Sequence, residues 1–194
     1  LLTVATVSAG SVEPRFTKNV CKNPTDGYIT FENGVDGAVV SSSIPGVVFS
    51  NTGGLDWQYI DFRNPIYNQN YARDGNFAAW LGVTGTDGKI TFTGDPATYV
   101  SALVAVGDQS DVSMQAYDVN GNQVDDSGLA GSNYGTGTMT RLTVEAPAIS
   151  YVIIHDTGNF WEVDDICTDA TGIPPVPEFP TAFLPAAFVI GFLG

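Results

Sequence analysis

The sequence has very little positive charge. Lysine and arginine total 7 residues against 21 aspartates and glutamates, so the formal net charge is −14. A chain of this sign repels the phosphate backbone of DNA and RNA, and this excludes nucleic acid as a partner. The same acidic excess suits a protein with a solvated exterior, or one that collects divalent cations.

The residue types that zinc sites and hydrolytic triads require are also scarce. The 194 residues include one histidine, His155, and two cysteines, Cys21 and Cys167. Zinc sites use several His or Cys ligands, and His155 is not accompanied by a G-x-S-x-G element. We therefore predict no catalytic residues and a protein that is not an enzyme. A pair of carboxylates would suffice for a glycosidase, so an extracellular polysaccharide hydrolase is the weaker alternative.

The two cysteines lie just before the first clear strand and near the end of the last one. In many β-sandwiches the terminal strands are neighbours, so the spacing favours one disulfide, Cys21–Cys167, that closes nearly the whole domain. A loop of that length would stabilise the fold by about 4–5 kcal/mol. The alternative is two unpaired thiols. The C-terminal segment favours the disulfide because it indicates an oxidising exterior.

Amphipathic helical patterns are absent, and short runs of β-favouring residues take their place. The runs alternate with turn signals supplied by many of the 22 glycines and 11 prolines, at a spacing of roughly 8–12 residues. Residues 99–106 are a nearly continuous apolar run, which predicts burial on both faces, and Asn120-Gly121 is the strongest hairpin signal. We expect an all-β, jelly-roll-like sandwich of about ten strands over residues 16–170. The expected strands are 28–32, 46–50, 55–62, 77–83, 89–93, 99–106, 112–118, 123–124, 141–145, 150–155 and 160–167.

Both ends of the sequence indicate export and anchoring. Residues 1–10 have the character of a signal-peptide remnant with a small-residue cleavage site; the alternative is a short N-terminal strand. Residues 171–180 form a proline-rich linker. Residues 181–194 carry no charge but are shorter than the roughly 20 residues that span a bilayer. We interpret them as the start of a truncated membrane anchor, with a buried core helix as the alternative.

The segment from Val176 to Pro180 (VPEFP), followed by Leu184, Pro185 and an Ala/Phe/Val/Ile run, resembles the PEF-type C-terminal sorting signal of archaeal surface proteins. The resemblance implies an extracellular protein that is anchored to the cell surface at its C-terminus. It also implies two partners, the membrane and an archaeosortase-type processing enzyme. The basic end of such signals is missing, as truncation would produce. The resemblance implies nothing about activity.

Three segments carry a second resemblance, to jelly-roll modules related to carbohydrate-binding modules: ITFE at 29–32, AYDVNGN at 116–122 and WEVDDI at 161–166. In such modules the first and last strands often share a structural calcium. The resemblance therefore implies Ca²⁺ as a cofactor, with Glu32 and one of Asp164 or Asp165 as ligands. Adjacent aspartates point to opposite faces of a strand. The alternative is that one of them caps a turn and the other faces water.

Aromatic residues are the best binding signal. Aromatic faces contact the apolar CH surfaces of sugars, while amides and charged groups contact the hydroxyls. The loop at 63–76 is polar, aromatic and too long for a tight turn, so it is expected to line a site. The alternative is that the tryptophans belong to the core and the loop tyrosines cover a sheet edge. The candidate ligand-binding residues are Trp57, Tyr59, Tyr67, Tyr71 and Arg73.

Two functional hypotheses follow. The first is a non-enzymatic cell-surface protein for adhesion or glycan binding, stabilised by calcium, whose partners are glycans or cell-envelope components. The second is a structural cell-envelope subunit that assembles with copies of itself. The second rests on the acidic composition, the lack of catalytic residues and the C-terminal segment.

Overall fold

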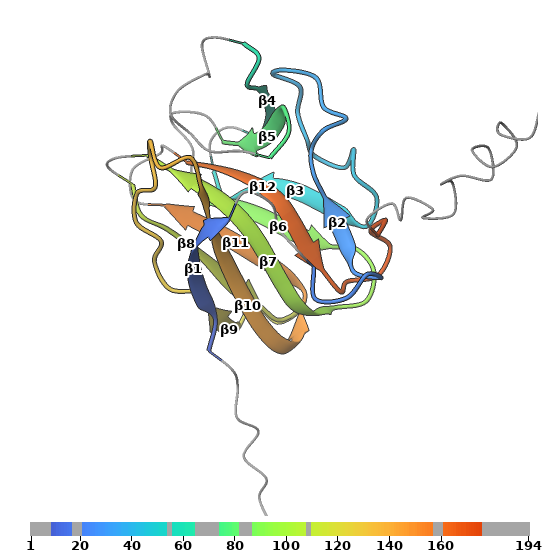
Figure 1. Cartoon of the computed structure of the whole chain (residues 1–194). Coiled ribbons are helices and arrows are strands. Elements are labelled where there is room, and N and C mark those ends of the chain that lie inside the picture. The colour runs from blue at the N-terminus through green and yellow to red at the C-terminus, as the bar shows by residue number, and fades with distance from the viewer. Residues whose placement is uncertain are drawn as a thin grey trace, which may run out of the picture.

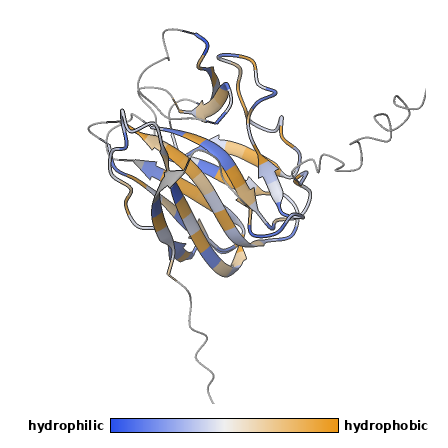
Figure 2. Cartoon of the chain, in the orientation of Figure 1, coloured by the Kyte–Doolittle hydropathy of each residue, from blue (hydrophilic) through white to orange (hydrophobic). Residues whose placement is uncertain are grey.

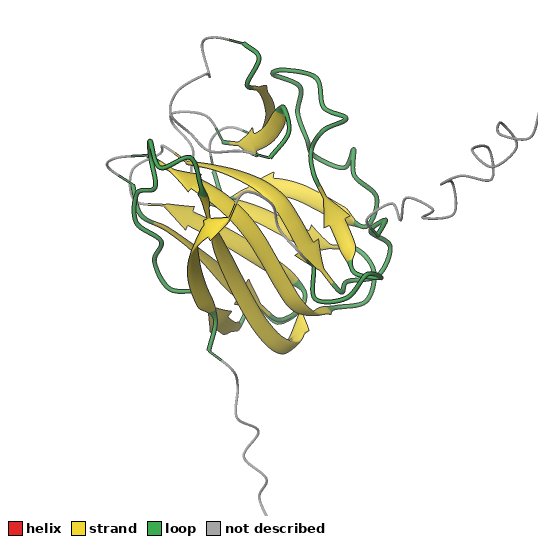
Figure 3. Ribbon diagram, in the orientation of Figure 1, coloured by secondary structure: helices red, strands yellow, loops and turns green. Residues whose placement is uncertain are grey.

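The computed structural model describes residues 9–16, 21–53, 56–64, 74–81, 87–107, 110–156 and 161–175. Their regular elements are all β-strands (Figures 1 and 3). These residues include no helix with the length and apolar character that crossing a membrane requires. The strands are β1 (Ser11–Phe16), β2 (Gly27–Ile29), β3 (Val47–Asn51), β4 (Gln58–Asp61), β5 (Phe77–Trp80), β6 (Gly88–Phe92), β7 (Ala97–Val106), β8 (Val112–Tyr117), β9 (Gln123–Asp126), β10 (Met139–Ile149), β11 (Tyr151–Asp156) and β12 (Trp161–Thr168).

The strands form two antiparallel sheets that pack face to face (Figure 1). One sheet has seven strands in the order β1-β10-β7-β12-β5-β4, with β2 also paired to β12. The other has five strands in the order β3-β6-β11-β8-β9. Neighbours in each sheet come from distant parts of the chain, as with β1 and β10 or β3 and β6. The prediction of an all-β sandwich is confirmed.

The main core lies between the two sheets. Figure 2 shows apolar and polar residues alternating along the strands, as expected when one face of a strand is buried. The strands β7 and β12 are exceptions: residues 99–106 of β7 are all buried, as predicted, and so is every residue of β12. Val100 and Val104 face the main core, whereas Leu103 and Ala105 form a second cluster with Met139. Burial on both faces explains the continuous apolar run in the sequence.

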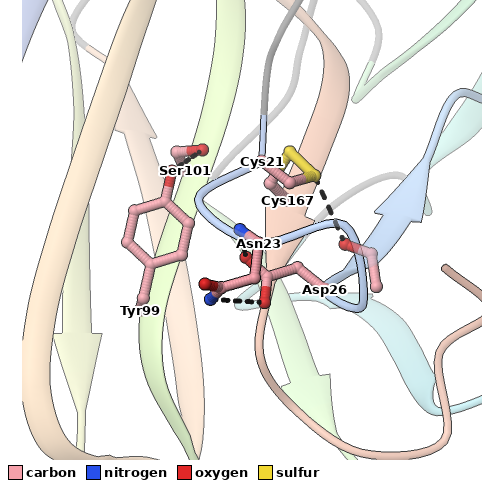
Figure 4. Close-up of a disulfide and its surroundings, with 7 residues drawn as sticks. Cys21, Asn23, Asp26, Tyr99, Ser101 and Cys167 are labelled. Atoms are coloured by element: carbon pink, nitrogen blue, oxygen red, sulfur yellow. Dashed lines mark hydrogen bonds between the residues drawn. A yellow bond between two sulfur atoms is a disulfide. The ribbon is translucent and has the colours of Figure 1, made fainter. Parts of the chain in front are cut away.

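The predicted disulfide is present. It joins Cys21 to Cys167 over a sequence separation of 146, with 5.3 Å between the two Cα atoms. Figure 4 shows that it pins the loop before β2 against the seven-stranded sheet. In this loop the Asp26 carboxylate accepts the backbone N–H of Asn23 at 2.9 Å and its side-chain amide at 3.1 Å. The bond and the turn together hold the entry to β2 in place.

The start of the domain differs from the expectation. The sequence analysis places the first sandwich residue at 16, yet β1 already pairs with β10. The strand contains Pro14, which has no N–H for a ladder hydrogen bond. It is tolerated because β1 is an edge strand and has only one partner.

The end of the domain also differs. Residue 171 is the predicted start of the linker, yet Ile173 is 6% exposed and belongs to the main core. The carbonyl of Pro174 accepts the backbone N–H of Tyr28, and Pro175 forms a bridge to Gly27. The described sandwich therefore extends through Pro175.

The other segment predictions lie outside the described residues. These are the first eight residues of the signal-peptide remnant, the sorting motif at 176–180 and the membrane anchor at 181–194. They stay predictions.

Candidate functional site

Two carboxylates hold the turn that precedes β5. Glu32 Oε1 accepts the backbone N–H groups of Asn76 and Phe77, each at 2.9 Å. Asp164 Oδ2, on β12, accepts the backbone N–H of Asp74 at 3.3 Å. We call Glu32, Asp164 and this turn the acidic clamp. It joins the segment after β2, the strand β12 and the start of β5, which lie far apart in the sequence.

The clamp requires glycine at position 75. The φ angle of Gly75 is +69°, in the left-handed region that residues with a Cβ rarely adopt. A Cβ here would also lie 2.2 Å from Glu32 Oε1, well inside van der Waals contact. Both the backbone conformation and the close approach of Glu32 therefore depend on the missing side chain.

Strand β12 carries two buried carboxylates where its register with β7 shifts. The shift lies between Asp164 and Cys167, and Asp165 adopts a left-handed φ of 48°. Asp164 is 1% exposed and Asp165 is 0% exposed. Every residue of β12 is buried, so both carboxylates are buried whichever face of the strand each one points to. The alternative in which one aspartate faces water is wrong.

Burial is the main cause that raises the pKa of Asp164 well above its usual range. The charges of Asp165 and Glu32 raise it further, and the N–H donors of Asp165 and Asp74 only partly oppose this. The pKa of the Tyr28 phenol on β2 is also raised, first by burial and then by the nearby Asp165 carboxylate. Ionisation of Asp164 beside Asp165 and Glu32 is therefore unfavourable unless a proton or a cation offsets the charge.

The calcium prediction names Glu32, Asp164 and Asp165. Their charges interact, and carboxylate oxygens are the donors that Ca²⁺ prefers, so the donor chemistry fits this ion. Within the part of the chain that the structure describes, however, no group of three or more His, Cys, Asp or Glu side chains is arranged to hold a metal ion. Backbone carbonyls would have to complete the ligand set, and calcium binding stays a prediction.

Two of the predicted ligand-binding residues belong to the core. Trp57 is 0% exposed, and its ring packs edge-to-face on Phe49 and on Trp161, with ring centroids 5.5 Å apart in each pair. Tyr59 is 8% exposed, and its hydroxyl lies 2.9 Å from that of Ser43. The prediction that Trp57 and Tyr59 contact a ligand is wrong, because both rings point into the sandwich.

The other three predicted ligand-binding residues, Tyr67, Tyr71 and Arg73, lie outside the described residues. Their loop is described only at its two ends. At one end the Arg63 guanidinium pairs with the Asp61 carboxylate at 2.7 Å. At the other end the acidic clamp attaches the chain to β12. The acidic clamp therefore fixes the point at which this loop enters the sandwich.

A second candidate site lies on the outer face of the five-stranded sheet. Tyr117 of β8 and Tyr151 of β11 are opposite each other in register, and their rings stack with centroids 4.9 Å apart and planes at 4°. On β6, Lys89 Nζ lies 3.8 Å from the centroid of the Tyr151 ring. The Tyr117 hydroxyl donates to Gln115 Oε1 at 2.8 Å. We call Lys89, Gln115, Tyr117, Tyr151 and the intervening Ile153 the tyrosine face.

The side chains of the tyrosine face are half-buried, so each is partly open to solvent. Stacked aromatic pairs across strands and a cation over a ring each contribute about 0.5–1 kcal/mol, which holds the groups in fixed positions. Lys89 takes part in no ion pair with another described residue. Within the described part of the chain, its charge is therefore not neutralised by a carboxylate.

Carboxylates border the tyrosine face. Burial is the main cause that raises the pKa of Tyr117, and Tyr151, Asp126 and Asp87 add to it. His155, further along β11, contacts the Asp87 carboxylate through Nδ1. One exposed surface thus combines aromatic rings, an amide, an ammonium group and an imidazole–carboxylate pair.

The sequence analysis missed the tyrosine face, although a signal was present. Gln115 and Tyr117 alternate with the buried Ala116, and Tyr151 and Ile153 alternate with the buried Val152. This period of two marks them as outward-facing. It does not show that β8 and β11 are neighbours, and only their pairing brings the two tyrosines together.

No protein-family model and no curated protein matches this sequence. Among solved structures, CsCBM6-3 from Clostridium stercorarium in complex with cellobiose is 13% identical, with a TM-score of 0.33 over 81% of this chain and 97% of that one. TmCBM61 in complex with β-1,4-galactotriose is 14% identical, with a TM-score of 0.34 over 78% and 97%. The enzymatically active domain of bacteriophage CBA120 tailspike protein 4 is 13% identical, with a TM-score of 0.33 over 76% and 21%. At TM-scores this low, none of these similarities carries an argument about function.

Proposed function

We propose that this chain is a non-enzymatic, carbohydrate-binding β-sandwich domain and that the tyrosine face is its glycan-binding surface. The observation that carries the proposal is the stacked Tyr117–Tyr151 pair with the Lys89 ammonium and the Gln115 amide beside it. A sugar ring has apolar CH surfaces and a rim of hydroxyls. Aromatic side chains contact the first, and amide and ammonium groups hydrogen-bond the second.

The shape of the tyrosine face favours a stretch of glycan chain. Its side chains come from three neighbouring strands, β6, β11 and β8. Strands lie about 4.8 Å apart and alternate residues of one strand about 6.8 Å apart, so the face measures roughly 10 by 7 Å, comparable to about two sugar rings. It is an open sheet surface, so a polysaccharide can lie across it without presenting a chain end.

A polysaccharide hydrolase is the weaker candidate. Such an enzyme needs two carboxyl groups, about 5 Å or about 6.5–9.5 Å apart, on either side of the scissile bond. In the acidic clamp, Glu32 accepts two backbone N–H groups, and Asp164 is 1% exposed and accepts the N–H of Asp74. Because these carboxylates accept hydrogen bonds from the turn before β5, glycan binding is a better proposal than glycan hydrolysis.

Calcium at the acidic clamp is a second part of the proposal, with Glu32, Asp164 and Asp165 as its carboxylate ligands. A bound cation would offset the burial and repulsion that raise the pKa of Asp164. Its role would be structural, because the clamp joins three segments of the sandwich. An extracellular location belongs to the same proposal, since the Cys21–Cys167 disulfide favours an oxidising compartment.

The test is calorimetric titration of the full chain with soluble neutral polysaccharides: xylan, mixed-linkage β-glucan, galactan and mannan. We expect one or more to bind, and Tyr151→Ala and Lys89→Ala to weaken that binding by about ten-fold or more, because each change removes a direct contact. Lys22→Ala is the matched control. Lys22 also lies over a tyrosine ring, that of Tyr99 at 4.3 Å, but it is in the loop before β2, and Tyr99 belongs to β7 of the seven-stranded sheet.

Loss of the Tyr117–Tyr151 stack removes about 0.5–1 kcal/mol of stability, so the thermal unfolding of each variant is measured alongside the titrations. Tyr151→Phe keeps the ring and should bind nearly as well as wild type. Wild-type affinity in both Tyr151→Ala and Lys89→Ala would show that glycans do not bind at the tyrosine face. If none of the polysaccharides binds, the proposal that this domain binds glycans is overturned.

A further inference from the structure

A groove lies beside the edge strand β1. It has a volume of about 590 Å³ and is lined by Val12 of β1, by residues of the loop between Leu129 and Thr138, and by Thr140 of β10. Pockets that bind small molecules typically have volumes of about 300–1,000 Å³. No lining residue of the groove belongs to the acidic clamp or to the tyrosine face, so this is a separate place on the molecule.

The wall of the groove is held in place by buried hydrogen bonds. Asn133 is 8% exposed; its Oδ1 accepts the N–H of Val106 at 2.8 Å, and its Nδ2 donates to Thr140 Oγ1 at 3.1 Å. Nearby, Ala130 and Val112 exchange two backbone hydrogen bonds of 2.7 and 2.9 Å. A satisfied buried network of this kind makes the loop rigid. The groove is therefore preformed, which reduces the entropy that binding would cost.

The described residues that line the groove include no Asp, Glu, Lys, Arg or His, although the whole chain carries a formal charge of −14. Val12 and Leu129 contribute apolar surface, and Leu129 is 62% exposed. Ser132, Thr136 and Thr138 contribute hydroxyl groups beside it. An apolar patch next to uncharged hydroxyls complements a neutral ligand that has both CH surface and hydroxyls.

We propose that this groove is a second binding site of the domain and that it takes a neutral mono- or disaccharide unit. Val12 and Leu129 cover the CH surface of the sugar, and the threonine hydroxyls exchange hydrogen bonds with its hydroxyls. An extended peptide that adds a strand to β1 fits less well, because Pro14 has no N–H for the new ladder.

The inference goes beyond a single glycan-binding surface. The tyrosine face is an open sheet surface that suits the interior of a polysaccharide, whereas the groove is concave and uncharged and suits a short unit. A domain with both sites holds two glycans at once. It therefore joins a polysaccharide on the tyrosine face to a short glycan unit in the groove without forming an oligomer.

Chemical-shift mapping by NMR on the full chain tests the second site, with cellobiose, lactose and maltose as separate probes. We expect at least one disaccharide to shift the amide signals of the groove loop while those of β6 and β11 stay in place. Leu129→Ala and Thr138→Val should each weaken this binding by roughly ten-fold. Val119→Ala is the matched control, because Val119 is 82% exposed in the turn between β8 and β9 and does not line the groove.

Tyr151→Ala separates this inference from the proposed function. We expect it to lose polysaccharide binding and to keep disaccharide binding in the groove. Shifts that map to the tyrosine face, or disaccharide binding that Leu129→Ala and Thr138→Val leave unchanged, would overturn the second site and leave glycan binding at the tyrosine face intact. The absence of shifts with all three disaccharides would overturn it too.

Discussion

Replacing Gly75 with alanine tests whether Glu32 holds the turn before β5. The chain offers a matched control, because φ is +69° at Gly75 and +73° at Gly37. A Cβ at Gly37 would meet nothing within 4 Å, whereas one at Gly75 would lie 2.2 Å from Glu32 Oε1. Gly37→Ala therefore introduces the same backbone strain without the clash.

The two variants should differ by the energy of the Glu32 contacts. Alanine at a left-handed φ costs about 1 kcal/mol, and both variants share this loss. At position 75 the new methyl group also displaces the carboxylate that accepts the N–H groups of Asn76 and Phe77. Each of these bonds contributes about 0.5–1.5 kcal/mol, and water replaces part of them because Glu32 is exposed. We expect the free energy of unfolding to fall by about 1 kcal/mol for Gly37→Ala and by about 2–3 kcal/mol for Gly75→Ala.

Urea unfolding measures these differences, provided that the m-value is the same in all variants. Glu32→Ala completes a double-mutant cycle, because without the carboxylate the Gly75→Ala change should cost no more than Gly37→Ala. Equal losses for Gly75→Ala and Gly37→Ala in the wild-type background would refute the contact between Glu32 and the turn. A loss at position 75 that Glu32→Ala does not reduce would refute it as well.

Three further predictions concern the disulfide and the acidic clamp. Cys21→Ala combined with Cys167→Ala should lower the free energy of unfolding by about 5 kcal/mol, since the bond closes a loop with a sequence separation of 146; a loss below about 1 kcal/mol in urea would contradict this. Calcium at 100 times its Kd should stabilise the fold by about 2.7 kcal/mol, seen as a rise in Tm that EGTA reverses and Glu32→Gln reduces; an unchanged Tm would remove calcium from the proposal. The pKa of Asp164 is raised by burial and by the charges of Asp165 and Glu32. Protonation of Asp164 therefore stabilises the folded state fully when the pH is below the pKa that Asp164 has in the unfolded chain. This stabilisation is lost as the pH rises through the higher pKa that Asp164 has in the folded protein. The calcium effect should therefore be larger near pH 7 than near pH 5, and an effect independent of pH would contradict the role of Asp164.

Much of the strand pattern could be predicted from local features of the sequence. The predicted segment 112–118 is close to β8, 99–106 lies within β7, and 160–167 is close to β12. Asn120-Gly121 forms the predicted turn, with Gly121 at a φ of +83°. Alternation and turn preference depend on adjacent residues only, so a single sequence contains them.

The boundaries of the domain could not be predicted in this way. β1 contains Pro14, which argues against a strand unless its position at the sheet edge is known. Ile173 follows the last strand and precedes prolines, as a linker residue would, yet it is buried in the core. In both cases a partner far away in the sequence decides the outcome.

By itself, the sequence determined that this chain is an all-β sandwich and favoured one disulfide, because alternation, turn signals and the presence of just two cysteines are properties of the chain alone. Only the tertiary structure decided which aromatic rings are buried and which are exposed. Trp57 and Tyr59 point into the core, while Tyr117 and Tyr151 meet on an open face. Alternation shows that a strand has two faces, but the pairing of distant strands determines which face is covered and which side chains become neighbours.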